Sequence, residues 1–513
     1  MDQGGRRRRA DHLFPRLYEQ SRTGRPGNPE GSASGRLGCP YRAERMIMTE
    51  ALTTFRSTLV ARPTDPLDAK VFDWLADNMG DVIAFERQPR WRPGWNAVVA
   101  RDGHEQRLYV RGPRGDSYVS PIDMHQEARI HQVFEANGIP APRVFGMIPD
   151  PLCIVMEELP GRIDTATIED PALRQAVRES FIDIVARIHA LPIERFESVG
   201  LPVPSTPEEV AMNLYAPSQR IFEQRIAGRR WPLMEFAWSW LKRNIPQGRN
   251  RLCFVNFDGG QFLFDEKGRI TGLIDFEVSS LGDPAAELAG MRLRDSTEKL
   301  GDLTALIRRY ESLSGDRIDR KLIEFHTAGF CAVNGFLMWP LMFDSAPEQD
   351  YVAYQHYCVA TSRFMIRAMA DHEGLVLEDP PLPQIDPLGF SQAARHLVRH
   401  LEAMPGGDAA ARYERDSAAA QAEHLGRVND YGMSVRAANM ADIAALTGGS
   451  VRDWDDAQDQ LSHWVAAHAG QGDADARLIL LFHRWLKRQS FLLRGCGQAA
   501  YLTDVDLQSV LHD

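Results

Sequence analysis

Polar side chains with oxygen atoms stand at both ends of an apolar segment near the middle of the chain. Asn256, Asp258 and Gln261 precede the segment, and Asp275 and Glu277 follow it. Carboxylate and amide oxygens are ligands that suit Mg²⁺. A loop of this kind followed by a metal-binding turn has the layout used for phosphoryl transfer. The alternative is that these are solvated turn residues, because Asp and Asn are common in turns.

The apolar segment itself is predicted to be a hairpin. Its two runs are Phe262–Phe264 and Ile270–Ile274, and the turn signal Glu266–Gly268 lies between them. Because the ends of a hairpin meet in space, we expect the polar residues on both sides to converge. Gly259 and Gly260 allow close approach of the backbone to a ligand.

A second candidate pair comes from two earlier elements. Glu127 falls on the apolar stripe of a helix predicted from Asp123 to Ala136, where an unpaired carboxylate is costly. Arg111 ends a predicted strand that begins at Leu108. A strand cation paired with a helix glutamate positions nucleotide phosphates in kinases. The alternative is an ordinary surface arginine and a half-exposed glutamate.

The elements before residue 161 are expected to position this pair. They are a helix at Leu67–Asn78, strands at Ala97–Ala100 and Leu108–Arg111 joined through the turn Asp102-Gly103, a helix opening with Ser120 as N-cap and ending at Asn137-Gly138, and a strand at Leu152–Glu157.

Helices dominate the rest of the chain, apart from the hairpin. They are expected at Pro171–Leu191, Pro207–Ala227, Pro232–Asn244, Ser296–Ser314 and Arg320–Phe343. After residue 389 only helical patterns remain, including an amphipathic segment from Asp473 to Gly495.

Composition narrows the classes of function. The chain has 513 residues, 44% hydrophobic and 25% charged, which is ordinary for a soluble protein of two or three domains. The net charge of −11 argues against a general nucleic-acid binder. No apolar run approaches the roughly 18–20 residues that a membrane span needs. The six cysteines are scattered, which favours reduced core thiols in the cytoplasm over a zinc site.

The first 47 residues form a distinct segment. Four arginines at Arg6–Arg9 and a Gly/Ser/Pro-rich stretch from Ser21 to Gly38 predict disorder. We expect the real start at Met46 or Met48, with the leader as a gene-model extension. The alternative is a basic arm that touches acidic partners.

Three motifs in order carry a resemblance to a known family. They are Phe254-Val-Asn-Phe-Asp-Gly-Gly-Gln-Phe-Leu263, Ile274-Asp-Phe-Glu277 and Gly282-Asp-Pro-Ala-Ala-Glu-Leu-Ala289. The chain resembles the aminoglycoside phosphotransferase/choline kinase-like family from about Phe72 to Met369. The resemblance implies an α+β, two-lobed protein-kinase-like fold: a small antiparallel sheet with a helix, then a mainly helical lobe. It also implies ATP and Mg²⁺ as cofactors and a hydroxyl-bearing small molecule as substrate.

The family's roles transfer position by position. Asp275 matches the metal-binding aspartate, and Gln261 stands where an asparagine binds the second metal. Arg111 replaces the phosphate-contacting lysine, with its charge kept and its geometry changed. The resemblance likewise implies that Glu127 and the strand residues Met156 and Glu157 belong to the nucleotide site. Asp283 matches an aspartate that braces the catalytic loop, and His189 is expected to be a packed structural residue.

Two residues depart from the family pattern: Phe254 stands where the resemblance implies a histidine, and Asn256 stands where it implies the catalytic aspartate. An amide cannot accept the proton of the substrate hydroxyl, and such assistance is worth about 10²–10⁴-fold. Positioning and charge neutralisation carry most of phosphoryl transfer, so slow transfer could survive. Asp258 could substitute if the loop is rearranged, although the spacing of Asn256 and Gln261 matches the usual pattern.

These observations predict five regions: a leader at 1–47, an N-lobe at 48–160, a helical C-lobe at 161–377, a Pro-rich linker at 378–388 and an all-α domain at 389–513. The leading hypothesis is an ATP- and Mg²⁺-dependent phosphotransferase. The alternatives are a catalytically impaired, pseudokinase-like binding protein, or an assembly role in which residues 389–513 dock a partner. The acceptor and the oligomeric state are not predicted.

Overall fold

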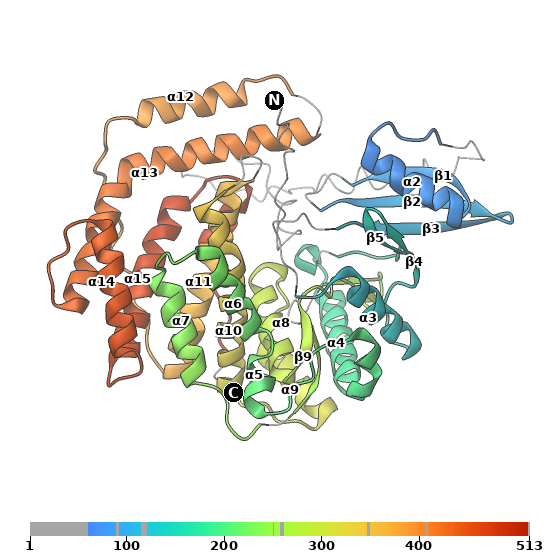
Figure 1. Cartoon of the computed structure of the whole chain (residues 1–513), viewed down its shortest axis with the longest axis horizontal. Helices are drawn as coiled ribbons and strands as arrows, with labels where there is room; N and C mark the ends of the chain where they lie inside the picture. The colour runs from blue at the N-terminus through green and yellow to red at the C-terminus, as the bar shows by residue number, and fades with distance from the viewer. Residues whose placement is uncertain are drawn as a thin grey trace. The chain divides into compact units, whose positions relative to one another are not determined.

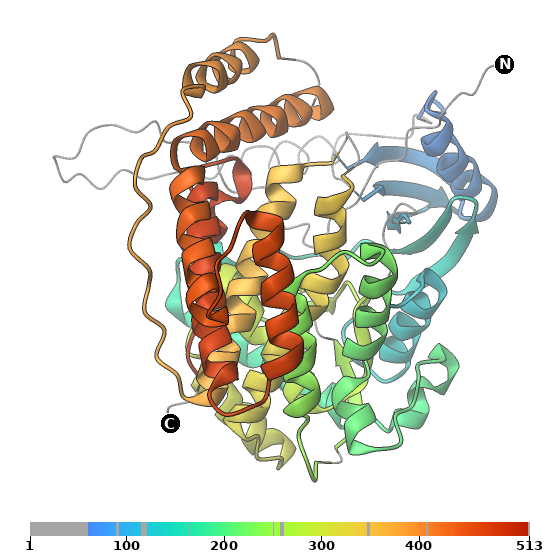
Figure 2. The same ribbon diagram turned by 60° about the vertical axis from the view of Figure 1, so that its left-hand side comes forward.

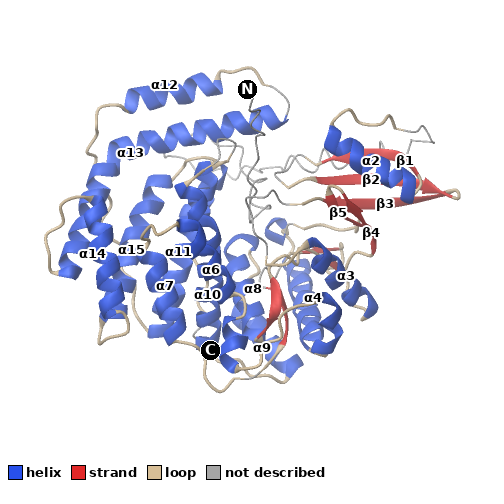
Figure 3. Cartoon of the chain, in the orientation of Figure 1, coloured by secondary structure: helices blue, strands red, loops and turns tan. Residues whose placement is uncertain are grey.

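The computed structural model describes residues 60–510, except 89–91, 114–120, 164, 250, 257–260, 346–348 and 407–408. The described residues form two compact units. The sheet unit contains residues 60–113 and 145–158, and the helical unit contains residues 121–144 and 159–510. Figure 3 shows the division of strands and helices between them. Among the described residues, no helix is long and apolar enough to cross a membrane.

The sheet unit is a five-stranded sheet with one helix, α2 (Pro66–Asn78), packed on it (Figure 1). Its strands, in the spatial order β1-β2-β3-β5-β4, are β1 (Asp81–Arg87), β2 (Gly94–Arg101), β3 (His104–Arg111), β5 (Leu152–Glu157) and β4 (Val144–Pro149). The predicted turn between β2 and β3 is confirmed: Asp102 and Gly103 have φ angles of 53° and 78°, as a tight hairpin turn requires. Val71, Leu75 and Trp95 lie in the core between helix and sheet.

The helical unit holds the remaining elements. Its longer helices are α3 (Met124–Ala136), α4 (Pro171–His189), α5 (Pro207–Met212), α6 (Tyr215–Ile226), α7 (Pro232–Arg243), α8 (Pro284–Glu298), α9 (Leu303–Ser314), α10 (Arg320–Phe343), α11 (Tyr351–Glu373), α12 (Ser391–Glu402), α13 (Ala409–Thr447), α14 (Trp454–His468) and α15 (Ala474–Leu493). Two antiparallel strand pairs lie among them: β6 (Cys253–Asn256) with β9 (Ser279–Gly282), and β7 (Phe262–Phe264) with β8 (Ile270–Leu273). The predicted fold class, α+β with a small antiparallel sheet followed by a mainly helical chain, is confirmed.

Three helices begin with the same N-terminal capping pattern. In α2, α4 and α8 an aspartate (Asp65, Asp170 and Asp283) caps the helix, and a proline follows at its first position. The carboxylate accepts backbone N–H groups that have no partner within the helix, and the proline lacks an N–H that would need one. This pattern fixes where α8 starts, directly after β9.

Three predicted helix boundaries are wrong. The helix carrying Glu127 begins after Asp123, which forms a capping box with Gln126, and not after Ser120. The helix expected from Pro207 to Ala227 is two helices, α5 and α6, with Pro217 in the first turn of α6. The helix expected from Ser296 to Ser314 is likewise the end of α8 followed by α9.

The Pro-rich segment at 378–388 runs extended beside the C-terminal helices (Figure 2). Asp379 pairs with Lys487 of α15 at 2.8 Å, and the Asp386 N–H donates to the Asp430 carbonyl of α13. The helices after residue 389 lie in the same compact unit as those before the segment. Independent folding of residues 389–513 stays a prediction.

Candidate active site

The two strand pairs of the helical unit bring three predicted site residues together. Phe262 pairs with Leu273, and the Ile274 N–H donates to the Gln261 carbonyl at 3.0 Å, so Gln261 and Asp275 lie at one end of the hairpin. Asn256 ends β6, and its Nδ2 donates to the Asp275 carbonyl at 3.3 Å. The convergence expected from the sequence is therefore present for Asn256, Gln261 and Asp275. All three side chains are buried.

Asp275 has a backbone conformation that only the surrounding structure can hold. Its φ of 68° lies in the left-handed region, which costs a non-glycine residue about 1–3 kcal/mol. The Asn256 side-chain amide donates a hydrogen bond to the Asp275 carbonyl. The N–H of the same peptide group, that of Phe276, donates to Glu127 Oε1 at 3.3 Å. Such strain at a carboxylate is typical of functional sites.

Glu127 therefore contacts the turn that carries Asp275. Its side chain is only 1% exposed, on the inward face of α3. The expected pairing with Arg111 stays a prediction, because Arg111 ends β3 in the sheet unit. The contact with Phe276 gives the buried carboxylate a role at the catalytic turn that sequence reasoning did not anticipate.

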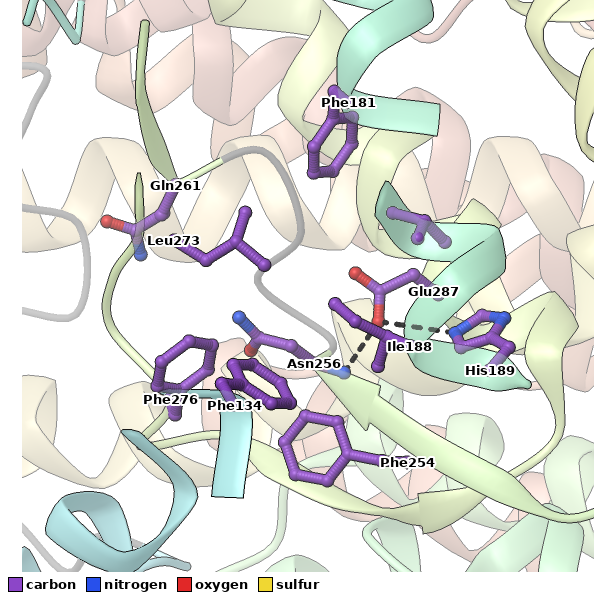
Figure 4. Close-up of a pocket in the computed structure, with 11 residues that line it drawn as sticks. Phe134, Phe181, Ile188, His189, Phe254, Asn256, Gln261, Leu273, Phe276 and Glu287 are labelled. Carbon is purple, nitrogen blue, oxygen red and sulfur yellow. Dashed lines mark hydrogen bonds and ion pairs between the residues drawn. The ribbon is translucent and has the colours of Figure 1, made fainter. Parts of the chain in front are cut away.

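The candidate catalytic segment, Cys253–Asn256, is held at its backbone by a residue that sequence reasoning missed. Glu287 Oε2 accepts the Asn256 N–H at 2.6 Å from the first turn of α8 (Figure 4). Asp283 caps α8 at the Ala285 N–H and pairs with Arg249 at 2.6 Å, and its expected role in bracing the loop stays a prediction. The signal available in the sequence was the acidic residue at position 287 within the third motif.

His189 lies between Tyr310 and Glu287. Its Nδ1 lies 2.8 Å from the Tyr310 hydroxyl, and its Nε2 lies 3.9 Å from Glu287 Oε2. Burial raises the pKa of Tyr310, so the phenol stays protonated and can donate to Nδ1. That arrangement leaves the Nε2 proton facing the Glu287 carboxylate. His189 is thus packed beside the candidate site, and its structural role stays a prediction.

Removing the Glu287 carboxylate should lower the free energy of unfolding of the protein. Replacing Glu287 with alanine leaves the buried Asn256 N–H without its acceptor, and losing a charged partner costs about 1.5–3 kcal/mol. We expect a lower midpoint of thermal unfolding for Glu287→Ala in scanning calorimetry. Glu266→Ala, at an exposed turn position, is the control and should unfold like wild type. Equal midpoints for the two variants would remove Glu287 from this role.

A small cavity of about 20 Å³ adjoins Asn256 and Glu287, enough for about one water molecule. Figure 4 shows the Asn256, Gln261 and Glu287 side chains around it, among phenylalanine rings. Asn256 Oδ1 is buried there and has no hydrogen-bond partner among the described residues. The amide therefore holds the turn through its nitrogen and keeps its oxygen unused.

Phe254 occupies the position where the resembled family has histidine, and it belongs to the core. Its ring stacks on Phe196 at 4.6 Å and meets Phe134 and Phe276 edge to face, at 5.4 Å and 6.4 Å. It is 1% exposed. The substitution replaces a polar ring by an apolar one in an aromatic cluster beneath the catalytic segment.

The other predicted nucleotide-site residues lie in the sheet unit. Arg111 and Met156 are buried, at positions on the neighbouring strands β3 and β5. Glu157 is exposed at the end of β5. Asp258, the candidate substitute base, lies outside the described residues.

Two side chains at this end of the hairpin, Asp275 and Gln261, are candidate magnesium ligands. Within the described ranges, no group of three or more His, Cys, Asp or Glu side chains could hold a metal ion. Magnesium, however, is usually bound through one or two carboxylates together with substrate phosphates and water. The carboxylate of Asp275 and the amide of Gln261 at one hairpin end fit that requirement.

Part of the chain matches the model of a known family. Residues 92–320 match the model of the phosphotransferase enzyme family APH. This match confirms the resemblance inferred from the three motifs.

Curated relatives include acyl-CoA dehydrogenase family member 10 of Mus musculus, 28% identical over 267 residues, and member 11 of Homo sapiens, 24% identical over 202 residues. The matches cover 49% and 37% of this chain, and 22% and 25% of those proteins. This chain thus matches about a quarter or less of the length of these relatives.

Solved structures include a macrolide 2′-phosphotransferase type I, with 18% identity and a TM-score of 0.43, covering 62% of this chain and 100% of that chain. Another is a thermostable mutant of aminoglycoside phosphotransferase APH(4)-Ia in complex with ADP and hygromycin B. It has 15% identity and a TM-score of 0.42, covering 57% of this chain and 98% of that chain.

Proposed function

We propose that this protein, whose residues 92–320 match the phosphotransferase enzyme family, transfers a phosphoryl group from ATP to a hydroxyl group of a small molecule. The observation that carries the proposal is the meeting of Asn256, Gln261 and Asp275 at one hairpin end. The reduced, buried cysteines at five described positions are in keeping with a cytoplasmic protein.

Magnesium is part of this proposal, and Asp275 and Gln261 would hold it. When bound, the ion neutralises charge on the transferred phosphates. Asp275 supplies a full negative charge, and the peptide group that follows it is tied at its carbonyl by Asn256 and at its N–H by Glu127. Because those hydrogen bonds fix the backbone of the turn before a ligand binds, little backbone ordering remains to be done on binding.

We assign Arg111 to contact the nucleotide phosphates. Met156 and Glu157, at the end of β5, are assigned to contact the rest of the nucleotide. Arg111 is a permanently charged donor at the end of β3 and can grip two phosphate oxygens at once. Met156 is apolar and buried, which suits contact with a base, and Glu157 is exposed beside it.

Asn256 is assigned to orient the acceptor hydroxyl without taking its proton. Its amide can hydrogen-bond an oxygen, but it has no basic group at neutral pH. Transfer is then slow, with positioning and charge neutralisation as the main contributions. Asp258 is the other carboxylate of this segment that could act as base.

The proposal is tested by measuring Mg·ATP binding by calorimetry and ADP release in the presence of candidate acceptors. An aminoglycoside, a macrolide and choline are suitable first acceptors, because each carries hydroxyl groups. Binding with acceptor-dependent ADP release supports the proposal. Binding without release for any acceptor supports the impaired, pseudokinase-like alternative. Absence of nucleotide binding contradicts both.

Arg111→Ala should weaken Mg·ATP binding. Loss of a charged hydrogen-bond donor to phosphate costs about 1.5–3 kcal/mol, or roughly 10–100-fold in Kd. The matched control is Arg107→Ala on the same strand, since Arg107 is half exposed and pairs with Glu158 at 2.9 Å. Calorimetric titration should separate the two variants. An equal loss in both would mean a general charge effect, and no loss in Arg111→Ala would exclude it from the site.

A further inference from the structure

The C-terminal segment at 498–510 packs into the core of the helical unit. It begins as a short 3-10 helix at Gln498–Thr503 and continues without regular structure. Val510 is fully buried in the same apolar cluster as Leu303 and Ile307 of α9. The segment is therefore part of the core that surrounds the candidate site.

Gln508 ties this segment to the end of α8 and the start of α9. Its backbone carbonyl accepts from Arg292 Nε at 2.7 Å. Its side chain accepts from the Leu303 N–H at 2.7 Å and donates to the Gly301 carbonyl at 2.7 Å. Three hydrogen bonds from one residue thus span the turn between the two helices.

Arg292 is the buried partner of this tie on α8. Its side chain is 1% exposed and pairs with Glu324 of α10 and with Asp371 of α11, the latter at 3.1 Å. A second arginine, Arg363 of α11, donates to three carbonyls of the same segment: Leu502 at 3.2 Å, Thr503 at 3.0 Å and Val505 at 2.8 Å. Buried guanidinium groups need acceptors, and the segment supplies three carbonyl acceptors to Arg363.

The same helix carries Glu287, five residues before Arg292. At 1.5 Å per residue, the two positions are about 7.5 Å apart along the helix axis. Glu287 holds the Asn256 N–H at 2.6 Å, a contact that weakens if α8 shifts by a fraction of an ångström. A displacement of about 1 Å at reacting groups can cost 10²-fold in rate.

We propose that the C-terminal segment is a clamp that sets the position of α8 and, through Glu287, the backbone of the catalytic segment at Asn256. Gln508 is then a positioning residue, although it lies more than 200 residues along the chain from Leu303 and Gly301. Its effect on turnover rests on the proposed phosphotransferase function. Its effect on the Asn256 backbone does not.

The test uses amide hydrogen exchange in the full chain. Gln508→Ala removes the two side-chain hydrogen bonds to Gly301 and Leu303 and keeps the backbone contact with Arg292. Because the lost bonds hold the turn that follows α8, exchange in the segment 253–256 should speed up roughly tenfold, the factor that corresponds to one lost hydrogen bond. Arg494→Ala is the matched control: Arg494 pairs with Asp504 of the same segment at 2.8 Å, and both side chains are more than half exposed. Strands β2 and β3 of the sheet unit report any change unrelated to the clamp.

Gln508→Met separates the hydrogen bonds from the space that the side chain fills. Faster exchange at 253–256 in both Gln508 variants, with wild-type exchange in Arg494→Ala, supports the clamp. Wild-type exchange in Gln508→Met, or faster exchange spread evenly over the helical unit, overturns it. Where turnover is measurable, kcat should fall in both Gln508 variants while KM for ATP stays unchanged. A protein that fails to bind ATP refutes the proposed function but leaves the exchange result readable.

Discussion

Replacing Asn256 with aspartate is expected to raise kcat roughly 10²–10⁴-fold, because the new carboxylate can accept the proton of the acceptor hydroxyl. Asparagine and aspartate are nearly equal in size, and one side-chain oxygen at this position already has no hydrogen-bond partner among the described residues. The substitution therefore places a base where space and an unused acceptor already exist. Steady-state ADP release with a fixed acceptor measures the gain.

The same substitution should lower stability. Asn256 Nδ2 now donates to the Asp275 carbonyl, and an aspartate oxygen cannot donate. Losing that buried hydrogen bond costs about 1–3 kcal/mol. We therefore expect higher turnover together with a lower midpoint of thermal unfolding.

Asn256→Ala is the control, because it removes the same hydrogen bond without adding a base. It should unfold at a lower temperature and show no gain in kcat. If Asn256→Asp also shows no gain, Asn256 is not at the position of the catalytic base. Loss of wild-type turnover in Asp258→Asn would then assign the base to Asp258.

Removal of the Asp275 carboxylate should reduce turnover by roughly 10³-fold or more, since metal stabilisation of transition-state charge is worth several kcal/mol. Asp275→Ala should also abolish the magnesium dependence of ATP binding. Titration of ATP with and without Mg²⁺ is the direct measurement. Unchanged Mg·ATP binding would exclude Asp275 as the metal ligand.

Two further variants separate the carboxylate from the backbone strain. Glycine adopts a φ of 68° freely, so Asp275→Gly should be as inactive as Asp275→Ala but more stable. Asp265→Ala is the control on the same hairpin, because Asp265 holds the turn and pairs with Arg269. It should keep wild-type metal dependence.

The local features of the site could be predicted from the sequence. Alternation and turn residues indicate the hairpin, and the motif spacing indicates Asn256, Gln261 and Asp275 as its neighbours. These predictions need only short-range information. The structure keeps each of these residues where the hairpin geometry requires it.

Long-range contacts could not be predicted in the same way. Nothing local distinguishes Glu287, which holds Asn256 from α8, from Asp283, which caps that helix. The predicted start of α3 was wrong because Ser120 and Asp123 are both favourable N-cap residues. Asp123 is the N-cap, and it forms a capping box with Gln126. The strand β1 was missed because its charged residues and register shift weaken the alternation.

The aromatic packing of Phe254 limits how this loop can change. A carboxylate at position 256 would meet a cavity, whereas a histidine at position 254 would be buried among Phe134, Phe196 and Phe276. An imidazole without a partner there costs about 1–3 kcal/mol. Asn256→Asp therefore places a carboxylate beside existing space, whereas Phe254→His buries an imidazole in a cluster of phenylalanine rings. Restoring the family's complete loop sequence therefore also requires a change in the core that gives the imidazole a hydrogen-bond partner.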